Sequence, residues 1–271
     1  MRAAISLAAI LLIVSCRDAQ RTFREPRTGL RFVLIPAGRF EMGSPATEKG
    51  HRGDETLHYV TLTKPFYMSA TEVTQEQWTT VMGSIPSHFQ GRNLPVESVS
   101  WFEVQEFLRR LNASNEGYFR LPTEAEWEYA CRAGSTGSYS FGEHLSASVA
   151  NYDGRAPKPV ASFPANAWGL YDMHGNVWEW CADEYCPYSS SEVSDPFQAC
   201  GSPYKVIRGG SWYFGADSGR SALRYTHEPR LRGFSIGFRV VRETPDSRGD
   251  AEEINKTAAF AGRRFIKSVF P

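Results

Sequence analysis

Three segments of the chain combine the hydrophobic spacing of amphipathic helices with a polar start. In each, a hydroxyl residue precedes Gln or Glu by three positions, which is the reciprocal pair of a capping box. The pairs are Thr74 and Gln77, Ser100 and Glu103, and Thr123 and Glu126. Apolar side chains then recur with helical spacing, most clearly at Val104, Phe107, Leu108 and Leu111. The pattern predicts three short helices that begin directly after the hydroxyl residues.

The remaining apolar positions form short runs that are interrupted by glycine, proline, asparagine and aspartate. Residues 30–41 are typical of two strands joined by a turn. Residues 59–68 are typical of extended chain, which Pro65 limits to a sheet edge or a strand end. After Gly134 helical periodicity disappears, and short apolar runs alternate with turn residues. The pattern predicts one α+β domain over residues 30–242, with short strands, few helices and much irregular backbone.

Both ends of the chain differ in composition from this domain. Residues 1–15 place Arg2 ahead of an apolar run that is too short to span a bilayer, which is typical of a signal peptide. Cys16 ends a sequence that resembles a bacterial lipobox, so we expect it to carry a lipid. Residues 16–29 then form a polar leader, and residues 243–271 a tail. The alternatives are an ordinary cleaved signal or an uncleaved N-terminus.

These features predict a membrane-anchored lipoprotein that faces the periplasm or the cell surface. Lys plus Arg and Asp plus Glu are both 30, so the net charge gives no electrostatic basis for binding nucleic acid. In an oxidising compartment the four other cysteines could pair in three ways. Cys186 and Cys200 flank a loop rich in Ser, Pro and Asp and are the first candidates for a disulfide. A Cys/His metal site is the weaker alternative.

Two later motifs bring aromatic, acidic and glycine residues together. Residues 169–180 combine Asp172 and Glu179 with a glycine turn and two tryptophans. Residues 208–212 are typical of a strand that ends at two glycines, where a backbone can approach a ligand or another chain closely.

Eight motifs, in order, resemble the formylglycine-generating enzyme, or sulfatase-modifying factor, family. They read IPAGRF at 35–40, FYM and EVT at 66–74, PV and VSW at 95–101, RLPTEAEWEYA at 120–130, GLYD at 169–172, GNVWEW at 175–180, RGGSW at 208–212 and GFR at 237–239. The resemblance implies a single domain related to the C-type lectin fold.

The family's enzyme oxidises a cysteine of sulfatases to formylglycine, with copper held by two cysteines shortly after the Gly-Gly-Ser motif. In this chain those positions fall on Phe214 and Gly219. Neither side chain supplies the thiolate that selects Cu(I). The resemblance therefore implies the fold, whereas these two residues argue against copper and against formylglycine generation.

The resemblance also implies structural calcium. The family segment matches two carboxylates and two backbone carbonyls, the hard oxygen ligands that Ca²⁺ takes, at Asp172, Gly175, Val177 and Glu179. A second site would use Asn151 and the carbonyl of Tyr152, but this chain lacks the longer loop that supplies its other ligands. The alternative is that Asp172 is a turn residue and Glu179 a paired carboxylate.

Position in the matching motifs also implies a ligand groove. Its expected residues are Trp178, Ser211, Trp212, Tyr213 and Arg220. Aromatic side chains beside the two glycines could hold an extended peptide. Alternatively, Trp178 and Trp212 belong to the hydrophobic core.

Two functions stay open. The first is a binding or scaffolding lipoprotein whose groove, or loop 183–207, recognises a protein, peptide or glycan of the cell envelope. The second is an exported non-copper enzyme of the same family, which oxidises or modifies a peptide or small molecule. Its candidate titratable groups are Asp217, Arg220, His227 and Glu228.

Overall fold

The computed structural model describes residues 22–114 and 117–244. Its helices are α2 (Gln75–Met82), α3 (Trp101–Asn112) and α4 (Glu124–Arg132). Each predicted capping box is present, with the hydroxyl accepting from the third backbone N–H and the Gln or Glu side chain accepting from the cap. A short 3₁₀ turn at Ala216–Gly219 is the other named helical element. The three helices are therefore confirmed where the sequence predicts them.

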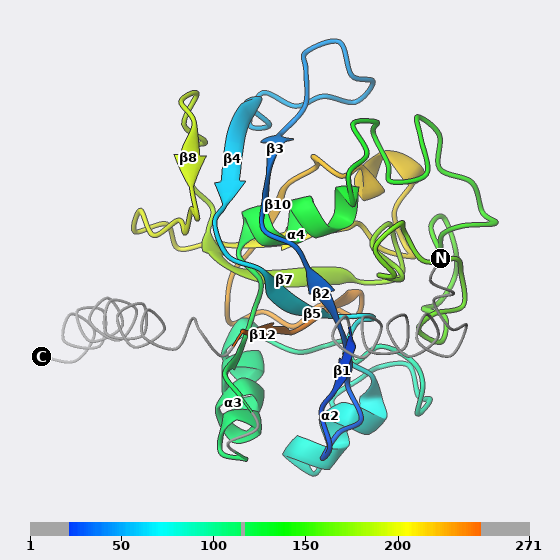
Figure 1. Ribbon diagram of the computed structural model, residues 1–271. Helices are drawn as coiled ribbons and strands as arrows, with labels where there is room; N and C mark the ends of the chain where they lie inside the picture. The colour runs from blue at the N-terminus through cyan, green and yellow to red at the C-terminus, as the bar shows by residue number, and fades with distance from the viewer. Residues whose placement is uncertain (1–21, 115–116, 245–271) are drawn as a thin grey trace, which may run out of the picture.

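The strands of the described residues pair in three sheets (Figure 1). The five-stranded sheet has the order β1 (Thr22–Arg24), β2 (Arg31–Ile35), β5 (Phe66–Ser69), β12 (Val241–Glu243) and β6 (Phe119–Arg120). The four-stranded sheet has the order β10 (Tyr225–His227), β9 (Lys205–Arg208), β7 (Trp178–Glu184) and β11 (Ile236–Gly237). The three-stranded sheet has the order β3 (Gly38–Met42), β4 (His58–Leu62) and β8 (Val193–Ser194). Strands from the two ends of the described chain thus share the five-stranded sheet.

The ordered domain begins earlier than residue 30, within the segment that the sequence indicates to be a leader. β1 pairs with β2 in antiparallel register, and the ring of Phe23 lies 5.9 Å from that of Phe32. At the other end, β12 includes Glu243, one residue beyond the predicted limit. A three-residue edge strand is too short to show alternation in the sequence. The predicted signal peptide, Cys16 and the tail beyond residue 244 lie outside the described residues.

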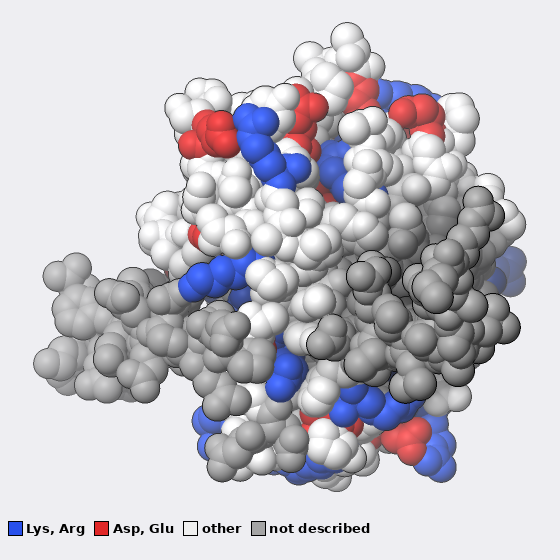
Figure 2. Space-filling model, in the orientation of Figure 1, with Lys and Arg blue, Asp and Glu red and all other residues white. Residues whose placement is uncertain are grey.

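Hydrophobic packing joins the helices to the sheets. Trp78 of α2 stacks on Phe107 of α3 with ring centroids 5.4 Å apart, and Trp127 of α4 and Trp180 of β7 are fully buried. Among the described residues, no helix has the length and apolar character that crossing a membrane requires. On the face shown in Figure 2, basic and acidic side chains are interspersed, as the balanced composition suggests.

Candidate functional site

Six aromatic rings gather where β7, β10 and the segment after the two glycines meet. Trp178 and Trp212 are buried, with 3% and 5% of their surface exposed. The other four rings are exposed by 42–58% and contact this base or one another. We call the six residues the aromatic surface: Trp178, Trp212, Tyr213, Phe214, Tyr225 and Phe234.

Trp178 shows how the surface is built on the core. Its ring centroid lies 5.9 Å from that of Phe214 and 5.7 Å from that of Tyr225, which come from different segments. Tyr213 in turn lies 5.6 Å from Phe234. Trp178 therefore has both of the roles considered for it, because its buried ring belongs to the core and also contacts exposed rings of the aromatic surface.

The backbone beside this surface turns at two glycines in the left-handed region. A Cβ at Gly210 would lie 2.9 Å from the backbone of Ser218, and one at Gly209 would lie 3.0 Å from the ring of Trp127. Their φ angles are +74° and +94°. The close approach that the glycines permit is therefore made to other segments of this same chain.

Arg220 lies in a buried ion-pair cluster rather than on the aromatic surface. Its guanidinium pairs with Glu55 at 2.6 Å and Glu48 at 2.5 Å, and only 1% of the residue is exposed. Ser211 is also buried, and its hydroxyl accepts a hydrogen bond from the backbone N–H of Tyr213 at 3.3 Å. Of the five residues expected in the groove, Trp178, Trp212 and Tyr213 belong to the aromatic surface.

The other candidate titratable groups do not converge on one point. Asp217 and Glu228 are exposed. His227 is half-buried, with its ring 5.9 Å from that of Trp180, and its Nδ1 lies 3.4 Å from the carbonyl of Glu228. Each of these three groups therefore has different surroundings, and no two of them form an acid–base pair.

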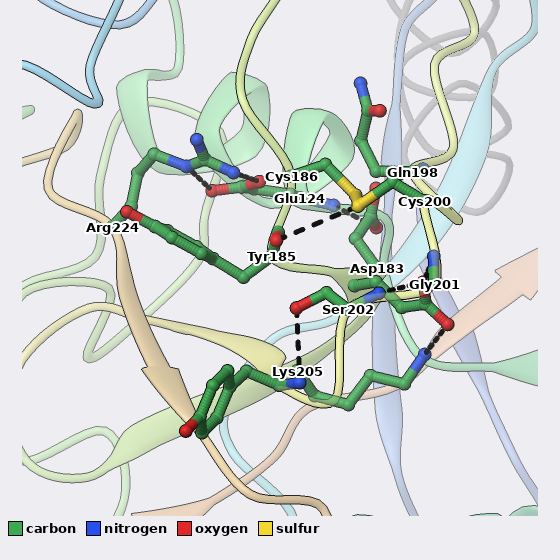
Figure 3. Close-up of a disulfide and its surroundings, with 12 residues drawn as sticks. Glu124, Asp183, Tyr185, Cys186, Gln198, Cys200, Gly201, Ser202, Lys205 and Arg224 are labelled. Atoms are coloured by element: carbon green, nitrogen blue, oxygen red, sulfur yellow. Dashed lines mark hydrogen bonds and ion pairs between the residues drawn. A yellow bond between two sulfur atoms is a disulfide. The ribbon is translucent and has the colours of Figure 1, made fainter.

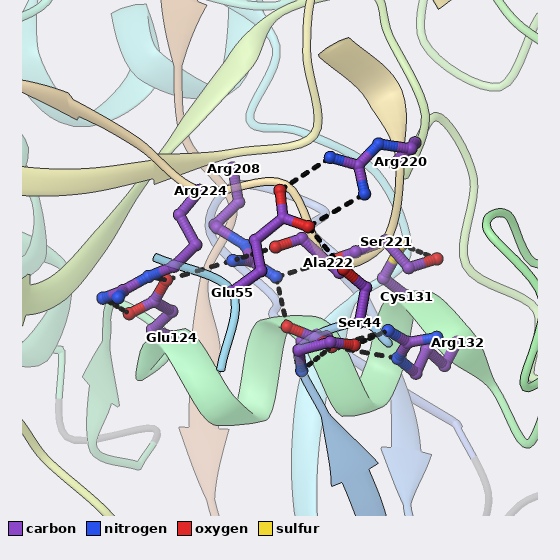
Figure 4. Close-up of polar contacts among 12 residues, drawn as sticks. Ser44, Glu55, Glu124, Cys131, Arg132, Arg208, Arg220, Ser221, Ala222 and Arg224 are labelled. Atoms are coloured by element: carbon purple, nitrogen blue, oxygen red, sulfur yellow. Dashed lines mark hydrogen bonds and ion pairs between the residues drawn. The ribbon is translucent and has the colours of Figure 1, made fainter. Parts of the chain in front are cut away.

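A second buried ion-pair cluster fixes the strand that leads into the glycine turn (Figure 4). Arg208 of β9 pairs with Glu124 at 3.0 Å and with Glu128 at 2.5 Å, both on α4. Arg224 also pairs with Glu124, and Arg132 with Glu128. Burying charges is costly unless they are paired with good geometry, so this cluster specifies how β9 lies on α4.

Cys186 and Cys200 form a disulfide that closes the loop after β7 (Figure 3). Asp183 lies nearby and accepts hydrogen bonds from the backbone N–H groups of Glu124 at 2.8 Å and Gln198 at 2.9 Å. Glu184 lies beside the disulfide, with its carboxylate and both sulfur atoms within 4.8 Å of one another. Sulfur atoms bonded to each other are not thiolates, so this group is a poor metal site as it stands.

The buried histidine of the first motif has a structural role. The Nδ1 of His174 donates to the carbonyl of Gly219 at 2.8 Å, and its Nε2 accepts from the backbone N–H of Ser140 at 3.0 Å. Burial lowers the pKa of His174 to about 4, so the ring is neutral at physiological pH. Its neighbour Cys131 is equally buried, which raises the pKa of that thiol to about 12. Neither side chain is poised for proton transfer or nucleophilic attack at neutral pH.

The two carboxylates of the predicted calcium segment have different surroundings. Both oxygens of Glu179 bond to Arg239, at 2.6 and 2.7 Å, and Oε2 also accepts from the indole N–H of Trp127 at 2.6 Å. Asp172 is buried with a φ of +58°, and its Oδ2 accepts from the backbone N–H of Ala161 at 2.7 Å. Asp172 thus fits a cation site, whereas the oxygens of Glu179 are already engaged.

The residues of the second predicted calcium site make internal hydrogen bonds. The side-chain amide of Asn151 donates to the carbonyl of Ala156 at 3.1 Å and to Oδ1 of Asn176 at 3.2 Å. The hydroxyl of Tyr152 donates to the carbonyl of Leu145 at 3.1 Å. Asn151 therefore braces the 172–177 segment, and the second site stays a prediction.

Residues 18–244 match the Sulfatase-modifying factor enzyme 1-like domain. The chain belongs to this family. It is 28% identical over 302 residues to the formylglycine-generating enzyme of Streptomyces coelicolor, which covers 84% of this chain and 94% of that enzyme. Among solved structures, PvdO from Pseudomonas aeruginosa superposes with a TM-score of 0.75 and 33% identity, over 82% of this chain and 98% of that one. The α+β sulfatase-modifying factor fold, related to the C-type lectin fold, is thereby established.

The same domain also occurs within longer proteins. The chain is 31% identical over 242 residues to the serine/threonine-protein kinase Pkn1 of Chlamydia trachomatis, which covers 78% of this chain. It spans between 37% and 40% of the length of three such chlamydial relatives. Membership of the family therefore establishes the fold of the domain. The activity has to be argued from the residues of the site.

The residues at the family's copper positions do not fit copper. Phe214 places an exposed ring in the aromatic surface, and Gly219 is buried with its carbonyl accepting from His174. The free cysteines among the described residues, Cys131 and Cys181, are buried. No pair of thiolates is therefore available at these positions for Cu(I).

Sequence reasoning missed two parts of the site. Tyr225 and Phe234 join the aromatic surface from segments that carry no recognised motif of the ligand groove. The EVT motif gives Glu72 no role in the site, although its buried carboxylate accepts a hydrogen bond from the side-chain amide of Asn176. The available sequence signal for Tyr225 and Phe234 is the occurrence of aromatic residues in the last part of the domain. The available signal for Glu72 is a glutamate between a predicted strand and a predicted helix cap.

Proposed function

We propose that this sulfatase-modifying-factor-like protein is an exported lipoprotein that binds a protein, peptide or glycan of the cell envelope. The aromatic surface is the observation that carries the proposal. Four exposed rings stand over two buried tryptophans, and Phe214 occupies a position where the resemblance implies a copper ligand. Contiguous exposed aromatic side chains are typical of recognition surfaces, because each ring buries a large apolar area when a ligand covers it.

Export and anchoring are supported by two independent features. The first is the signal-like start of the chain, with Cys16 at the end of its lipobox-like sequence. The second is the disulfide between Cys186 and Cys200, because disulfides persist in oxidising compartments outside the cytoplasm. A lipid at Cys16 would hold the domain at a membrane surface.

A non-copper enzyme of the same family is the second candidate, and the geometry gives it less support. An enzyme needs titratable groups that converge on one reacting atom. Asp217 and Glu228 are exposed, and they do not converge with another candidate group on one point. Arg220 is paired with two buried carboxylates. A binding protein needs only a complementary surface, which the rings supply.

Photocrosslinking in the cells that produce the protein tests the proposal. A benzoylphenylalanine is placed at Tyr213, and the matched control position is Phe102, which is 48% exposed on α3 outside the aromatic surface. We expect a discrete adduct from position 213, none from position 102, and loss of the adduct when Phe234→Ala is added. Digestion of the adduct by a protease or by glycosidases distinguishes a protein or peptide from a glycan.

A third position separates the aromatic surface from the loop that the disulfide closes. Phe197 is 40% exposed in that loop. An adduct from position 197 with none from position 213 would assign recognition to the loop and overturn the proposal for the aromatic surface. Equal labelling at positions 213 and 102 would show that the rings at the aromatic surface have no selective partner.

A further inference from the structure

Two exposed arginines lie side by side at the β1 edge of the five-stranded sheet. Arg24 of β1 is directly opposite Arg31 of β2 in the antiparallel register. Arg24 donates to the carbonyl of Gly29 at 3.0 Å, and the guanidinium of Arg31 lies 5.9 Å from the ring centroid of Tyr171. Neither arginine forms an ion pair with an acidic side chain of the described residues. Like charges on opposite residues of two strands repel, and an anionic partner that covers them would remove this cost.

A third exposed arginine lies in the turn after β1, which runs beside α2 (Figure 1). Arg27 donates to the carbonyl of Thr80 at 3.2 Å and to that of Arg110 at 3.4 Å. These carbonyls belong to the last turns of α2 and α3, where the helix dipole attracts a cation. The nearby carboxylate of Glu25 is fully buried and accepts hydrogen bonds from Thr28. Arg27 is therefore held at the surface by neutral carbonyls.

The excess of positive charge is local to this part of the chain. Lys plus Arg and Asp plus Glu are both 30 in the whole sequence, whereas residues 16–31 contain five arginines and two acidic residues. Arg24 follows Cys16 by eight positions. Eight residues of fully extended chain reach at most about 30 Å, so a lipid at Cys16 would keep these arginines near the membrane surface. We call Arg24, Arg27 and Arg31 the arginine edge.

We propose that the arginine edge docks on a membrane surface that contains anionic phospholipids. The inference rests on the lipid anchor of the proposed function, because the anchor brings the membrane to this edge. Arginines next to a membrane anchor are attracted by anionic headgroups, and the planar guanidinium matches the geometry of a phosphate. The attraction adds to the hold of the lipid and turns the β1 edge of the domain toward the membrane.

Vesicle binding by the full chain with Cys16→Ser tests the arginine edge in the absence of a lipid. The vesicles contain phosphatidylcholine alone or mixed with phosphatidylglycerol, at low ionic strength because salt screens exposed charges. We expect tighter binding to the anionic vesicles, and Arg24→Gln/Arg31→Gln to weaken it by at least about tenfold, since each arginine contributes about fivefold. Binding to phosphatidylcholine alone measures the contribution of the apolar N-terminal run and should not change.

Two further variants separate the arginine edge from the overall charge. Arg52→Gln/Arg155→Gln is the matched control, since both residues are exposed and neither lies on β1 or β2. It removes the same charge and should bind the anionic vesicles like the parent protein. Arg24→Lys/Arg31→Lys keeps the charge and should retain at least most of the binding. Equal losses in the two Gln variants, or equal binding of the parent protein to both kinds of vesicle, would overturn the proposal.

Failure of this inference is distinguishable from failure of the proposed anchor. The vesicle assay uses protein without a lipid, so a lack of lipid at Cys16 in cells would leave its outcome unchanged. Conversely, a lipid at Cys16 together with no preference for anionic vesicles would keep the anchor and overturn the arginine edge. Should Arg24→Gln/Arg31→Gln fail to fold, Arg27→Gln alone is expected to weaken binding to the anionic vesicles by about fivefold.

Discussion

Single residues at the glycine turn show how tightly the segments around the aromatic surface approach one another. Gly210 has a φ of +74°, and a Cβ added there would lie only 2.9 Å from the backbone of Ser218. Gly215, in the same connection, has a φ of −67° and no atom within 4 Å of a Cβ added to it. The two glycines therefore differ in physical role although the sequence presents them alike.

Alanine substitution separates these roles. Gly210→Ala should lower the free energy of unfolding by about 1–3 kcal/mol, because the side chain is strained at positive φ and meets a backbone that cannot move freely. Gly215→Ala should be neutral or stabilising by up to about 1 kcal/mol, since it reduces only the freedom of the unfolded chain. Urea unfolding of both variants measures the difference, and equal stabilities would contradict the crowding at Gly210.

At the scale of the elements, Asp183 links a strand, a helix and a loop. It lies on β7, and its carboxylate accepts from the first residue of α4 and from the loop that the disulfide closes. The side chain is buried beside Glu124, and burial together with that charge raises the pKa of Asp183 to about 7. The native protein therefore holds a proton at Asp183 that the unfolded chain releases at much lower pH.

This linkage predicts how stability changes with pH. Between about pH 4 and pH 7 the native state binds the proton and the unfolded state does not, so Asp183 makes stability fall as pH rises, by up to about 1.4 kcal/mol per pH unit. Asp183→Asn cannot titrate and loses one acceptor, so it should be less stable than the wild type at pH 4.5, with a smaller difference at pH 7.5. Urea unfolding across this range measures both slopes, and parallel slopes would refute the assignment.

For the molecule as a whole, the proposed N-terminal anchor would decide where the domain works. The family fold begins within a few residues of Cys16, since the match starts at residue 18 and β1 at Thr22. A lipid at Cys16 would thus hold the five-stranded sheet, to which β1 belongs, close to the membrane.

Substitution of the lipobox cysteine tests the anchor. Cys16→Ser should abolish incorporation of labelled palmitate and move the protein from the membrane fraction to the soluble fraction, because the hydroxyl cannot form the thioether that carries the lipid. The Cys186→Ser/Cys200→Ser double variant is the control and should retain the label. A Cys16→Ser protein that stays labelled and membrane-bound would exclude a lipid at this position.

The sequence by itself determined the local elements and the family. Capping boxes and helical spacing placed α2, α3 and α4, because both signals act between residues three or four positions apart. Eight ordered motifs identified the fold, and the absence of cysteine at Phe214 and Gly219 was readable without coordinates.

Only the tertiary structure decided which of the recognised residues act together. It placed Arg220 in a buried ion-pair cluster, engaged Glu179 with Arg239, and brought Glu72 to Asp172 across a hundred residues of sequence. It also joined Tyr225 and Phe234 to the rings beside the glycine turn. Charge pairing and burial depend on contacts between distant segments, and a pattern of neighbouring residues carries no record of those contacts.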